Sequence, residues 1–351
     1  MSGPWRLEDR FHRFITYLRI SVIDRCNLRC RYCMPAEGVA WKPREQILTF
    51  EEIRRIVEVA VRLGVRKVRL TGGEPLVRRE VARLVEMLAQ VPGLEEVALS
   101  TNGVLLAEKA AELKAAGLSR VNVSLDTLQP EKFRLITRGG ELERVLRGIE
   151  VAYAVGLRPV KVNTVVMRGF NEDEVVDFAL WTLESPIVVR FIELMPFLNE
   201  EGMDLTDPFK PIDCEAKVAE FLPLEEVRRR VEGALGPLEP APPPPSGGSL
   251  PLLPSTSGPA EYWRLPNAQG LIGFIHTMSD HICQRCNRVR LTADGKLKPC
   301  LLSEEEVEVL TAARYGTEED IERAFRQLMA IKPEKGTRSR RRPEAMVQIG
   351  G

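Results

Sequence analysis

The stretch Tyr17-Leu-Arg-Ile-Ser-Val-Ile-Asp-Arg-Cys26-Asn-Leu-Arg-Cys30-Arg-Tyr-Cys33-Met-Pro35 decides the fold, because it joins a strand to a cluster of thiols. Residues 17–23 are typical of a strand, and the loop after them has the spacing Cys-x3-Cys-x2-Cys. Thiolates this close together bind soft metals and iron–sulfur clusters, and three leave one iron of a cubane open. A zinc site would need a fourth ligand, and no Cys or His follows within the next thirty residues. The loop therefore predicts a cluster site; the alternative is three cysteines without a joint role.

Length and composition limit the number of domains, the kinds of partner and the location that this protein can have. The chain has 351 residues and 44% hydrophobic content, enough for one large or two modest domains. Lys+Arg and Asp+Glu balance at 50 each, so no overall basic field favours a nucleic-acid partner. We find no run of about 18 apolar residues and no apolar signal core, and we expect no membrane partner. The expected location is cytoplasmic, where seven cysteines indicate metal binding rather than disulfides.

Strand-like and helix-like runs alternate at short spacing through the first half of the chain. This alternation predicts parallel strands joined by right-handed crossovers. Six units are too few for a closed eight-stranded barrel, so the expected fold class is α/β, an incomplete parallel (β/α)6 TIM-type barrel with a C-terminal iron–sulfur extension. A capping box at Thr49 and Glu52 precedes the first helix, which stops at Gly64, and the segment Asn171 to Glu174 is expected to cap a later one. The other expected helices are 78–91, 105–116 and 142–155, and the expected strands are 17–23, 67–71, 97–100, 121–125, 160–166 and 187–194.

Polar and thiol residues follow the predicted strands at the ends where such barrels carry out chemistry. Each motif alone is ordinary turn chemistry, and their coincidence at one end of one sheet predicts a site. The motifs are the loop from Cys26, Gly72-Gly73-Glu74-Pro75, Ser100-Thr101-Asn102-Gly103, Ser124-Leu-Asp126, Lys161 with Asn163, and Met195-Pro196.

The pattern loosens after about residue 197. A further helix is expected over 222–233, short strands over 262–265 and 271–275, and a last helix over 317–330. Residues 236–258 are rich in Pro, Ser and Gly, which predicts a flexible insert or linker with neither helix nor strand. The expected division is a barrel over 1–235, the insert or linker over 236–260, an auxiliary-cluster region over 261–335 and a basic tail ending in double glycine over 336–351.

A second set of thiols lies near the end of the chain. Cys283, Cys286 and Cys300 have the spacing Cys-x2-Cys-x13-Cys, which again leaves one metal position open. A zinc knuckle with His281 as fourth ligand is the alternative. Alternate residues of a strand share one face, so Arg288 and Arg290 are expected to point the same way and to form a phosphate site.

The motifs together resemble the GTP 3′,8-cyclase family (molybdenum cofactor biosynthesis protein A) of the radical S-adenosylmethionine (SAM) superfamily. The resemblance covers nearly the whole chain, through TYLRISVIDRCNLRCRYCMP, VRLTGGEPLVR, LSTNG, VNVSLDT, VNTVVMRGFN, RFIELMP, CQRCNRVRLTADGKLKPCL and the terminal MVQIGG. It implies an incomplete barrel, two [4Fe-4S] clusters, SAM and GTP. It also implies that a 5′-deoxyadenosyl radical removes H3′ of GTP and that the ribose carbon then attacks guanine C8. The implied product is (8S)-3′,8-cyclo-7,8-dihydroguanosine 5′-triphosphate, formed in the first step of molybdenum cofactor biosynthesis.

The resemblance also implies roles for particular positions. Three groups follow by matching motifs: cluster ligands, SAM contacts and GTP contacts. The cluster ligands are Cys26, Cys30 and Cys33 for the SAM cluster and Cys283, Cys286 and Cys300 for a second cluster whose open iron meets guanine. The SAM contacts are Tyr32, Gly73, Ser124 and Met195. The GTP contacts are Arg19, Arg69, Ser100, Lys161, Arg288 and Arg290, with Lys67 and Arg190 as weaker candidates. Gly350 and Gly351 resemble a family tail that reaches toward the active site.

The resemblance implies partners and leaves alternatives. It implies an electron donor and transfer of the product to cyclic pyranopterin monophosphate synthase. We expect the chain to be a monomer or a homodimer. One alternative is another radical SAM enzyme with an auxiliary cluster that acts on a peptide. Another is a non-catalytic zinc protein that binds nucleic acid, against which the balanced charge argues. The sequence departs from the family at Ile23, at Gln284-Arg285 and in the Pro-rich insert, and none of these departures changes an expected cluster ligand.

Overall fold

The structure, a computed structural model, describes residues 6–195, 221–245, 258–279, 282–336 and 347. Cys214, His281 and the terminal Gly350 and Gly351 lie outside the described residues. Within the described part, none of the helices combines the length and the apolar character needed to cross a bilayer.

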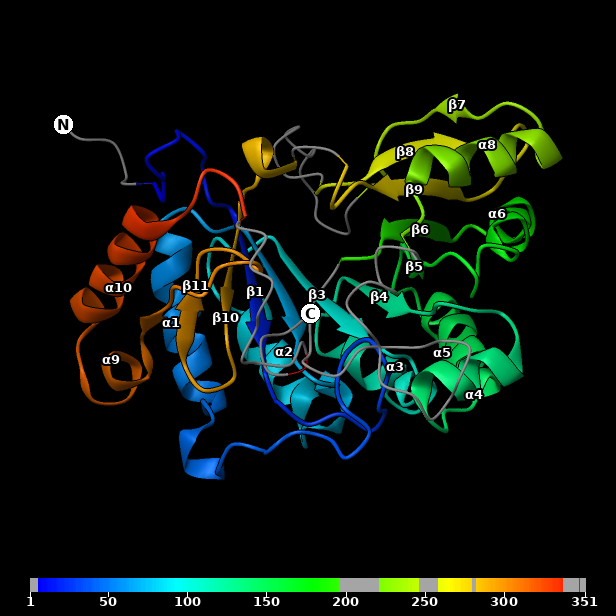
Figure 1. Ribbon diagram of the computed structural model, residues 1–351. Helices are drawn as coiled ribbons and strands as arrows, with labels where there is room; N and C mark the ends of the chain where they lie inside the picture. Colours follow the sequence, from blue (N-terminus) through cyan, green and yellow to red (C-terminus); the bar gives the residue numbers. More distant parts are fainter. Residues whose placement is uncertain (1–5, 196–220, 246–257, 280–281, 337–346, 348–351) are drawn as a thin grey trace.

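A single mixed sheet of twelve strands organises the described chain (Figure 1). Its centre is six parallel strands in chain order, and β1 and β6 do not pair with each other, so the incomplete (β/α)6 barrel is confirmed. The six strands are β1 (Tyr17–Ser21), β2 (Lys67–Thr71), β3 (Glu96–Thr101), β4 (Arg120–Ser124), β5 (Lys161–Val166) and β6 (Val188–Glu193).

Strands from the C-terminal third extend the sheet at both ends. The strand β10 (Arg288–Leu291) lies parallel to β1, and β9 (Leu271–Ile275) lies parallel to β6. Both pairings join segments that are far apart in the sequence, and neither was predicted. Antiparallel strands complete the sheet, β11 (Lys296–Lys298) and β12 (Val307–Glu308) beyond β10, and β8 (Glu261–Arg264) and β7 (Glu239–Pro240) beyond β9.

Helices cover the outer face of the parallel strands. The predicted capping box is present at α1 (Phe50–Arg62), where Thr49 and Glu52 satisfy each other's backbone N–H groups. The sequence did not predict α4 (Pro130–Thr137), whose signal is a proline in its first turn. The last helices, α9 and α10, lie against α1 on the left of Figure 1. The remaining helices are α2 (Val81–Ala89), α3 (Leu106–Ala115), α5 (Leu142–Ala154), α6 (Val175–Glu184), α8 (Leu224–Leu235), α9 (Leu310–Tyr315) and α10 (Glu318–Ile331).

Two local predictions hold only in part. The segment Asn171 to Glu174 ends in the N-cap of α6, which is Glu174, but no side-chain hydrogen bond caps the helix. The Asn171 side chain instead hydrogen-bonds the backbone of Met167, Asp126 and Val165. The segment 236–258 is not wholly without regular structure, because β7 pairs with β8. Proline is tolerated there because β7 is an edge strand, where one side of the backbone needs no partner.

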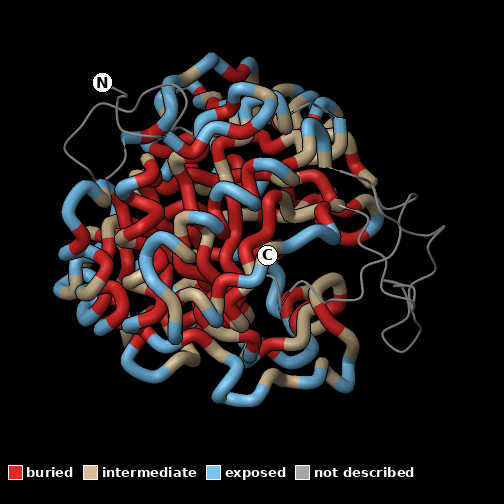
Figure 2. The backbone as a smooth tube through the Cα atoms, turned by 90° about the vertical axis from the view of Figure 1, so that its left-hand side faces the viewer, coloured by how far each residue is buried: buried red, intermediate tan, exposed pale blue. Residues whose placement is uncertain are grey.

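The core lies between the sheet and its helices. Leu18, Ile20, Val68 and Leu70 are fully buried in it, and Figure 2 shows buried backbone filling the middle of the molecule. Each such side chain contributes about 1.5–3 kcal/mol by leaving water. Since side chains alternate across a strand, the residues between these apolar ones face the opposite side, and in β1 and β2 they are basic. The sheet therefore has an apolar face toward the helices and a charged face toward the barrel interior.

Candidate active site

The loops after the first three strands meet at one end of the sheet. Gly73 N donates to Ile23 O at 2.7 Å and Glu74 N donates to Arg25 O at 2.8 Å, which ties the loop after β2 to the loop of the first thiols. The Glu74 carboxylate accepts hydrogen bonds from Thr101 Oγ1 at 2.7 Å and from Asn102 N at 2.6 Å, both at the end of β3. Glu74 therefore links three loops.

The end of β4 joins the same region. Tyr32, between the second and third cysteine, donates its hydroxyl hydrogen to Asp126 Oδ2 at 2.7 Å. Asn102 Nδ2 lies 3.8 Å from Cys26 Sγ, which also accepts from Leu28 N at 3.4 Å. The predicted gathering of strand-end motifs at one site is thus present for the loops after β1 to β4.

The first three thiols are free, partly buried and close to one another. Burial raises the pKa of Cys30, and Cys33 and Cys26 raise it further because neighbouring thiolates repel. Burial and Cys26 raise the pKa of Cys33 to about 12. In the described residues no three Cys, His, Asp or Glu side chains converge on one point as ligands of a single ion. A cubane cluster does not require that arrangement, since its thiolates bind different irons, and removal of the thiol protons by metal would relieve the raised pKa values.

Val347, the fifth residue from the end of the sequence, also borders this site. Its side chain is 2% exposed and packs with Met34, Cys26 and Cys33. The backbone of Val347 also hydrogen-bonds the Cys33 thiol. Of the SAM contacts expected from the resemblance, Tyr32 and Gly73 lie here by the bonds above. Ser124 ends β4 and is exposed, and Met195 lies just beyond β6 and is half-buried.

Strand register brings the predicted basic residues together inside the barrel. Arg19 of β1 stands opposite Arg69 of β2 on one side and Arg290 of β10 on the other. Arg288 lies two residues before Arg290 on β10 and stands opposite Tyr17 of β1. Because these strands are parallel and in register, the arginines point to the same face.

A second row of polar residues crosses β3, β4 and β5. Ser100 stands opposite Asn122, and Asn122 stands opposite Lys161. Lys161 Nζ lies 3.3 Å from the Tyr262 hydroxyl, and Arg190 on β6 donates to Asn163 Oδ1. The structure therefore places Ser100 and Lys161 in the same barrel interior as the arginines.

The barrel interior holds an excess of buried positive charge. Burial lowers the pKa of Arg19 well below its ordinary value, and Arg290 and Arg69 lower it further. Burial also lowers the pKa of Lys161, with Arg120 and Arg190 acting in the same direction. These shifts mean that each cation is destabilised by its neighbours, and a bound anion would remove that destabilisation.

Hydrogen-bond donors also remain available there. In the described structure, Arg69 Nε, Arg190 Nε and Asn122 Nδ2 are buried without a hydrogen-bond partner. Glu96 binds Arg120 at 2.6 Å and Lys67 at 3.6 Å, while the described residues form no ion pair with Arg69, Lys161 or Arg190. Buried donors are ordinarily satisfied, so this interior fits a polar, polyanionic ligand.

The second set of thiols lies beside this charged face. Cys283 lies in a short 3-10 turn, Ile282–Arg285. Cys286 lies two residues before the first residue of β10. Burial alone would raise the pKa of Cys286, but the positive charges of Arg288 and Lys332 outweigh burial and lower it to about 6. A thiol with a lowered pKa is a good metal ligand at neutral pH.

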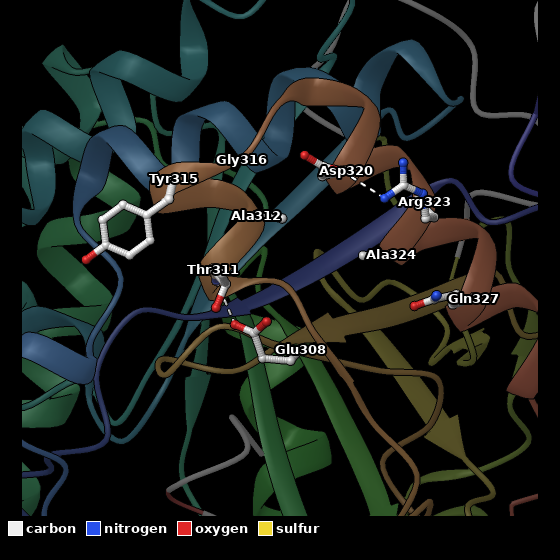
Figure 3. A pocket seen from close by; sticks show the side chains of 9 residues that line it. All are labelled: Glu308, Thr311, Ala312, Tyr315, Gly316, Asp320, Arg323, Ala324 and Gln327. Atoms are coloured by element: carbon white, nitrogen blue, oxygen red, sulfur yellow. Dashed lines mark hydrogen bonds and ion pairs between the residues drawn. The ribbon is translucent and has the colours of Figure 1, made fainter.

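A cavity of about 380 Å³ lies elsewhere, between α9 and α10 (Figure 3). Its lining includes Thr311, Tyr315 and Gln327, and Arg323 is held by Asp320 at 2.8 Å. None of the thiols and none of the basic residues of the barrel interior lines it. The cavity is therefore separate from the candidate site.

Sequence reasoning missed residues that act through tertiary contacts. Glu74 and Asp126 were part of quoted motifs, and their position directly after strands was the available signal. Arg120, Glu96 and Lys332 had no such signal, since each is a single charged residue in an ordinary strand or helix end.

Known proteins resemble this chain over nearly its full length. The Radical SAM superfamily matches residues 20–182, and Molybdenum Cofactor Synthesis C matches residues 247–337. The GTP 3′,8-cyclase of Moorella thermoacetica is 47% identical over 348 residues, covering 98% of this chain and 100% of the relative. Those of Pelotomaculum thermopropionicum and Thermodesulfovibrio yellowstonii are 46% and 45% identical, each covering 98% of this chain and 100% of the relative.

One solved structure shares the fold at low identity. SuiB of Streptococcus suis bound to S-adenosylmethionine is 12% identical, with a TM-score of 0.55, covering 88% of this chain and 64% of that chain. This chain thus spans somewhat less than two thirds of SuiB, and the likeness concerns the fold alone.

Proposed function

The chain belongs to the GTP 3′,8-cyclase family, and from this premise we propose how its residues divide the work of that reaction. It is a radical SAM enzyme that cyclises GTP in molybdenum cofactor biosynthesis. An iron–sulfur cluster and SAM follow from its superfamily. When bound, they supply the one-electron chemistry that activates the ribose of GTP, and the protein supplies position and electrostatics.

The first thiol set holds that cluster and the neighbouring loops hold SAM. Cys26, Cys30 and Cys33 are the ligands in this proposal. Tyr32, Gly73, Ser124 and Met195 line SAM. The backbone bonds from Gly73 to Ile23 and from Glu74 to Arg25 support it, because they fix the thiol loop and the glycine loop relative to each other.

The basic interior of the barrel binds GTP. The single observation that carries this step is the register of Arg69, Arg19 and Arg290 side by side on three adjacent strands. Arg290 is buried and Arg19 and Arg69 are partly buried. Three such guanidinium groups at one level favour a polyanion, and a triphosphate offers oxygens in the geometry that arginine binds best. Ser100, Lys161 and Arg288 complete the site. Lys67 and Arg190, buried in the same interior, are further contacts.

The second thiol set binds a second [4Fe-4S] cluster whose open iron meets the guanine base. Cys286 and Arg288 are two residues apart, which supports a base and a phosphate held by neighbouring parts of one segment. Cys283 and Cys300 are the other ligands. We divide the chain accordingly into a barrel over 1–235, an insert over 236–260, an auxiliary-cluster region over 261–335 and a tail over 336–351.

The remaining partners follow from the reaction. The product, (8S)-3′,8-cyclo-7,8-dihydroguanosine 5′-triphosphate, passes to cyclic pyranopterin monophosphate synthase. An external donor supplies two electrons per turnover, one for the cleavage of SAM and one, with a proton, for the cyclised nucleotide radical. We propose a monomer or a homodimer without nucleic-acid or membrane partners. The use of cysteines as metal ligands favours a cytoplasmic location.

The test is an anaerobic assay with GTP, SAM and a chemical reductant. We expect SAM cleavage together with a GTP-derived product of the same mass as GTP, identified by mass spectrometry, and iron and sulfide in the purified protein. A peptide-modifying enzyme would cleave SAM without changing GTP. Purified protein that contains zinc and no sulfide would contradict the proposal.

A further inference from the structure

Lys332, directly after α10, is buried against the second thiol set. Its side chain has 1% exposure, although a lysine is rarely buried without a counter-charge. Its Nζ donates to Pro299 O at 2.7 Å and to Arg288 O at 2.9 Å, and it lies 3.9 Å from Cys286 Sγ. Pro299 precedes Cys300 directly, so one ammonium holds the backbone beside two of the three cysteines.

Arg13 holds the same region from the other side. It is ion-paired with Asp9 at 2.7 Å and donates to Cys283 O at 2.7 Å. It also donates to the carbonyls of Pro333 and Glu334, the two residues after Lys332. The N-terminal segment, the thiol segment and the end of α10 are therefore joined around the three cysteines.

Lys332 differs from Arg13 in its counter-charge. Arg13 has Asp9, whereas no carboxylate in the described structure forms an ion pair with Lys332. A buried ammonium that binds only carbonyls is costly unless an anion lies near it. The group within reach is Cys286 Sγ, and a thiolate there supplies the negative charge.

We propose that Lys332 is the positioning residue of the second thiol set: it fixes the backbone next to Cys286 and Cys300 and places a positive charge against the Cys286 sulfur. The inference rests on the proposed second cluster and adds a residue that sets its properties. A cation beside a ligand sulfur stabilises the thiolate and the more reduced, more negative form of the cluster. Loss of the charge should make the reduction potential more negative and speed the release of iron.

The experiment isolates the second cluster in the full-length chain. The background carries Cys26→Ala, Cys30→Ala and Cys33→Ala, so that iron is held by the second set alone. Lys332→Met removes charge and donor, Lys332→Gln keeps a donor without charge, and Lys332→Arg keeps both. Lys335→Met is the matched control, because Lys335 is exposed three residues further on. Iron and sulfide content, iron release to a chelator and the midpoint potential from an EPR-monitored titration are measured anaerobically.

The outcomes separate this inference from the proposed function. We expect the background and Lys335→Met to retain iron with one potential, Lys332→Met and Lys332→Gln to shift it to more negative values and release iron faster, and Lys332→Arg to restore both. If Lys332→Met retains no iron, a difference between Lys332→Gln and Lys332→Arg supports the proposal, and identical behaviour of the two overturns it. Unchanged potential and release in Lys332→Met also overturn it. A background that binds no iron would instead refute the second cluster itself, and the inference with it.

Discussion

Gly73 and Val347 pack so closely that a β-carbon on the glycine would lie 2.8 Å from Cγ2 of the valine. One belongs to the loop after β2 and the other to the last residues of the chain, and both border the first thiol set. Val347 is therefore part of the wall of that site.

Gly73→Ala should abolish SAM cleavage. The new methyl group would lie 2.2 Å from Arg25 O, a backbone atom that cannot move without shifting the thiol loop. The measurement is 5′-deoxyadenosine formation and SAM binding under anaerobic conditions. Gly233→Ala is the control, since nothing lies within 4 Å of a β-carbon there. SAM cleavage by Gly73→Ala at the wild-type rate would show that this loop does not contact SAM.

Deletion of Gly350 and Gly351 should uncouple SAM cleavage from product formation. Val347 packs at the first thiol set, and Gly350 follows it by only three positions in the sequence. We expect iron content and GTP binding to stay largely intact and product yield per SAM cleaved to fall strongly. A C-terminal tag should have the same effect as the deletion. Equal yields from the shortened and full-length proteins would assign the tail no part in the reaction.

The two thiol sets should be separable by single substitutions. Cys26→Ala should abolish SAM cleavage, because it removes a ligand of the cluster that supplies the electron. Cys283→Ala should leave the first cluster and its SAM cleavage in place and lose productive GTP binding. Iron content and SAM cleavage of each variant, measured anaerobically, test this. Complete cyclisation of GTP by either variant would refute the ligand assignment.

Arg288→Ala and Arg290→Ala should each weaken GTP binding by about 1.5–3 kcal/mol, the range for a hydrogen bond to a charged group. SAM cleavage without GTP should change little, since neither arginine lies at the first thiol set. Isothermal titration with GTP and assay of SAM cleavage measure the two effects. Arg147→Ala, an exposed arginine on α5, controls for loss of charge alone. Unchanged affinity in both variants would mean that this strand does not meet the nucleotide.

The sequence predicted what is encoded locally. The strand 67–71 has the predicted bounds, and β1 differs from 17–23 only at its end. Alternation of apolar and polar residues within a strand, and of strands with helices, needs no knowledge of distant contacts. The two thiol sets were equally visible, because the ligands of each lie within one segment.

The rest depends on contacts that leave no local pattern. Nothing in the residues of β10 states that it pairs with β1, and the alignment of Arg19 with Arg290 follows only from that pairing. Lys332 ends an ordinary amphipathic helix, and its bonds to Arg288 and Pro299 exist only in the folded chain. The short α4 was missed because one proline in its first turn is a weak helix signal.

The pairing of β1 with β10 can form only after both strands have been synthesised, and the two are made at very different times. A hydrogen bond from Asn287 to Thr16 beside this pairing spans 271 positions of the sequence, so a ribosome releases β1 long before its neighbour exists. Closing so long a separation is slow, and until then β1 presents an open strand edge to other chains. Arg290 is the last arginine of the proposed nucleotide site to be synthesised, so a chain that ends before it would lack part of that site. On this proposal, synthesis of nearly the whole chain precedes GTP binding.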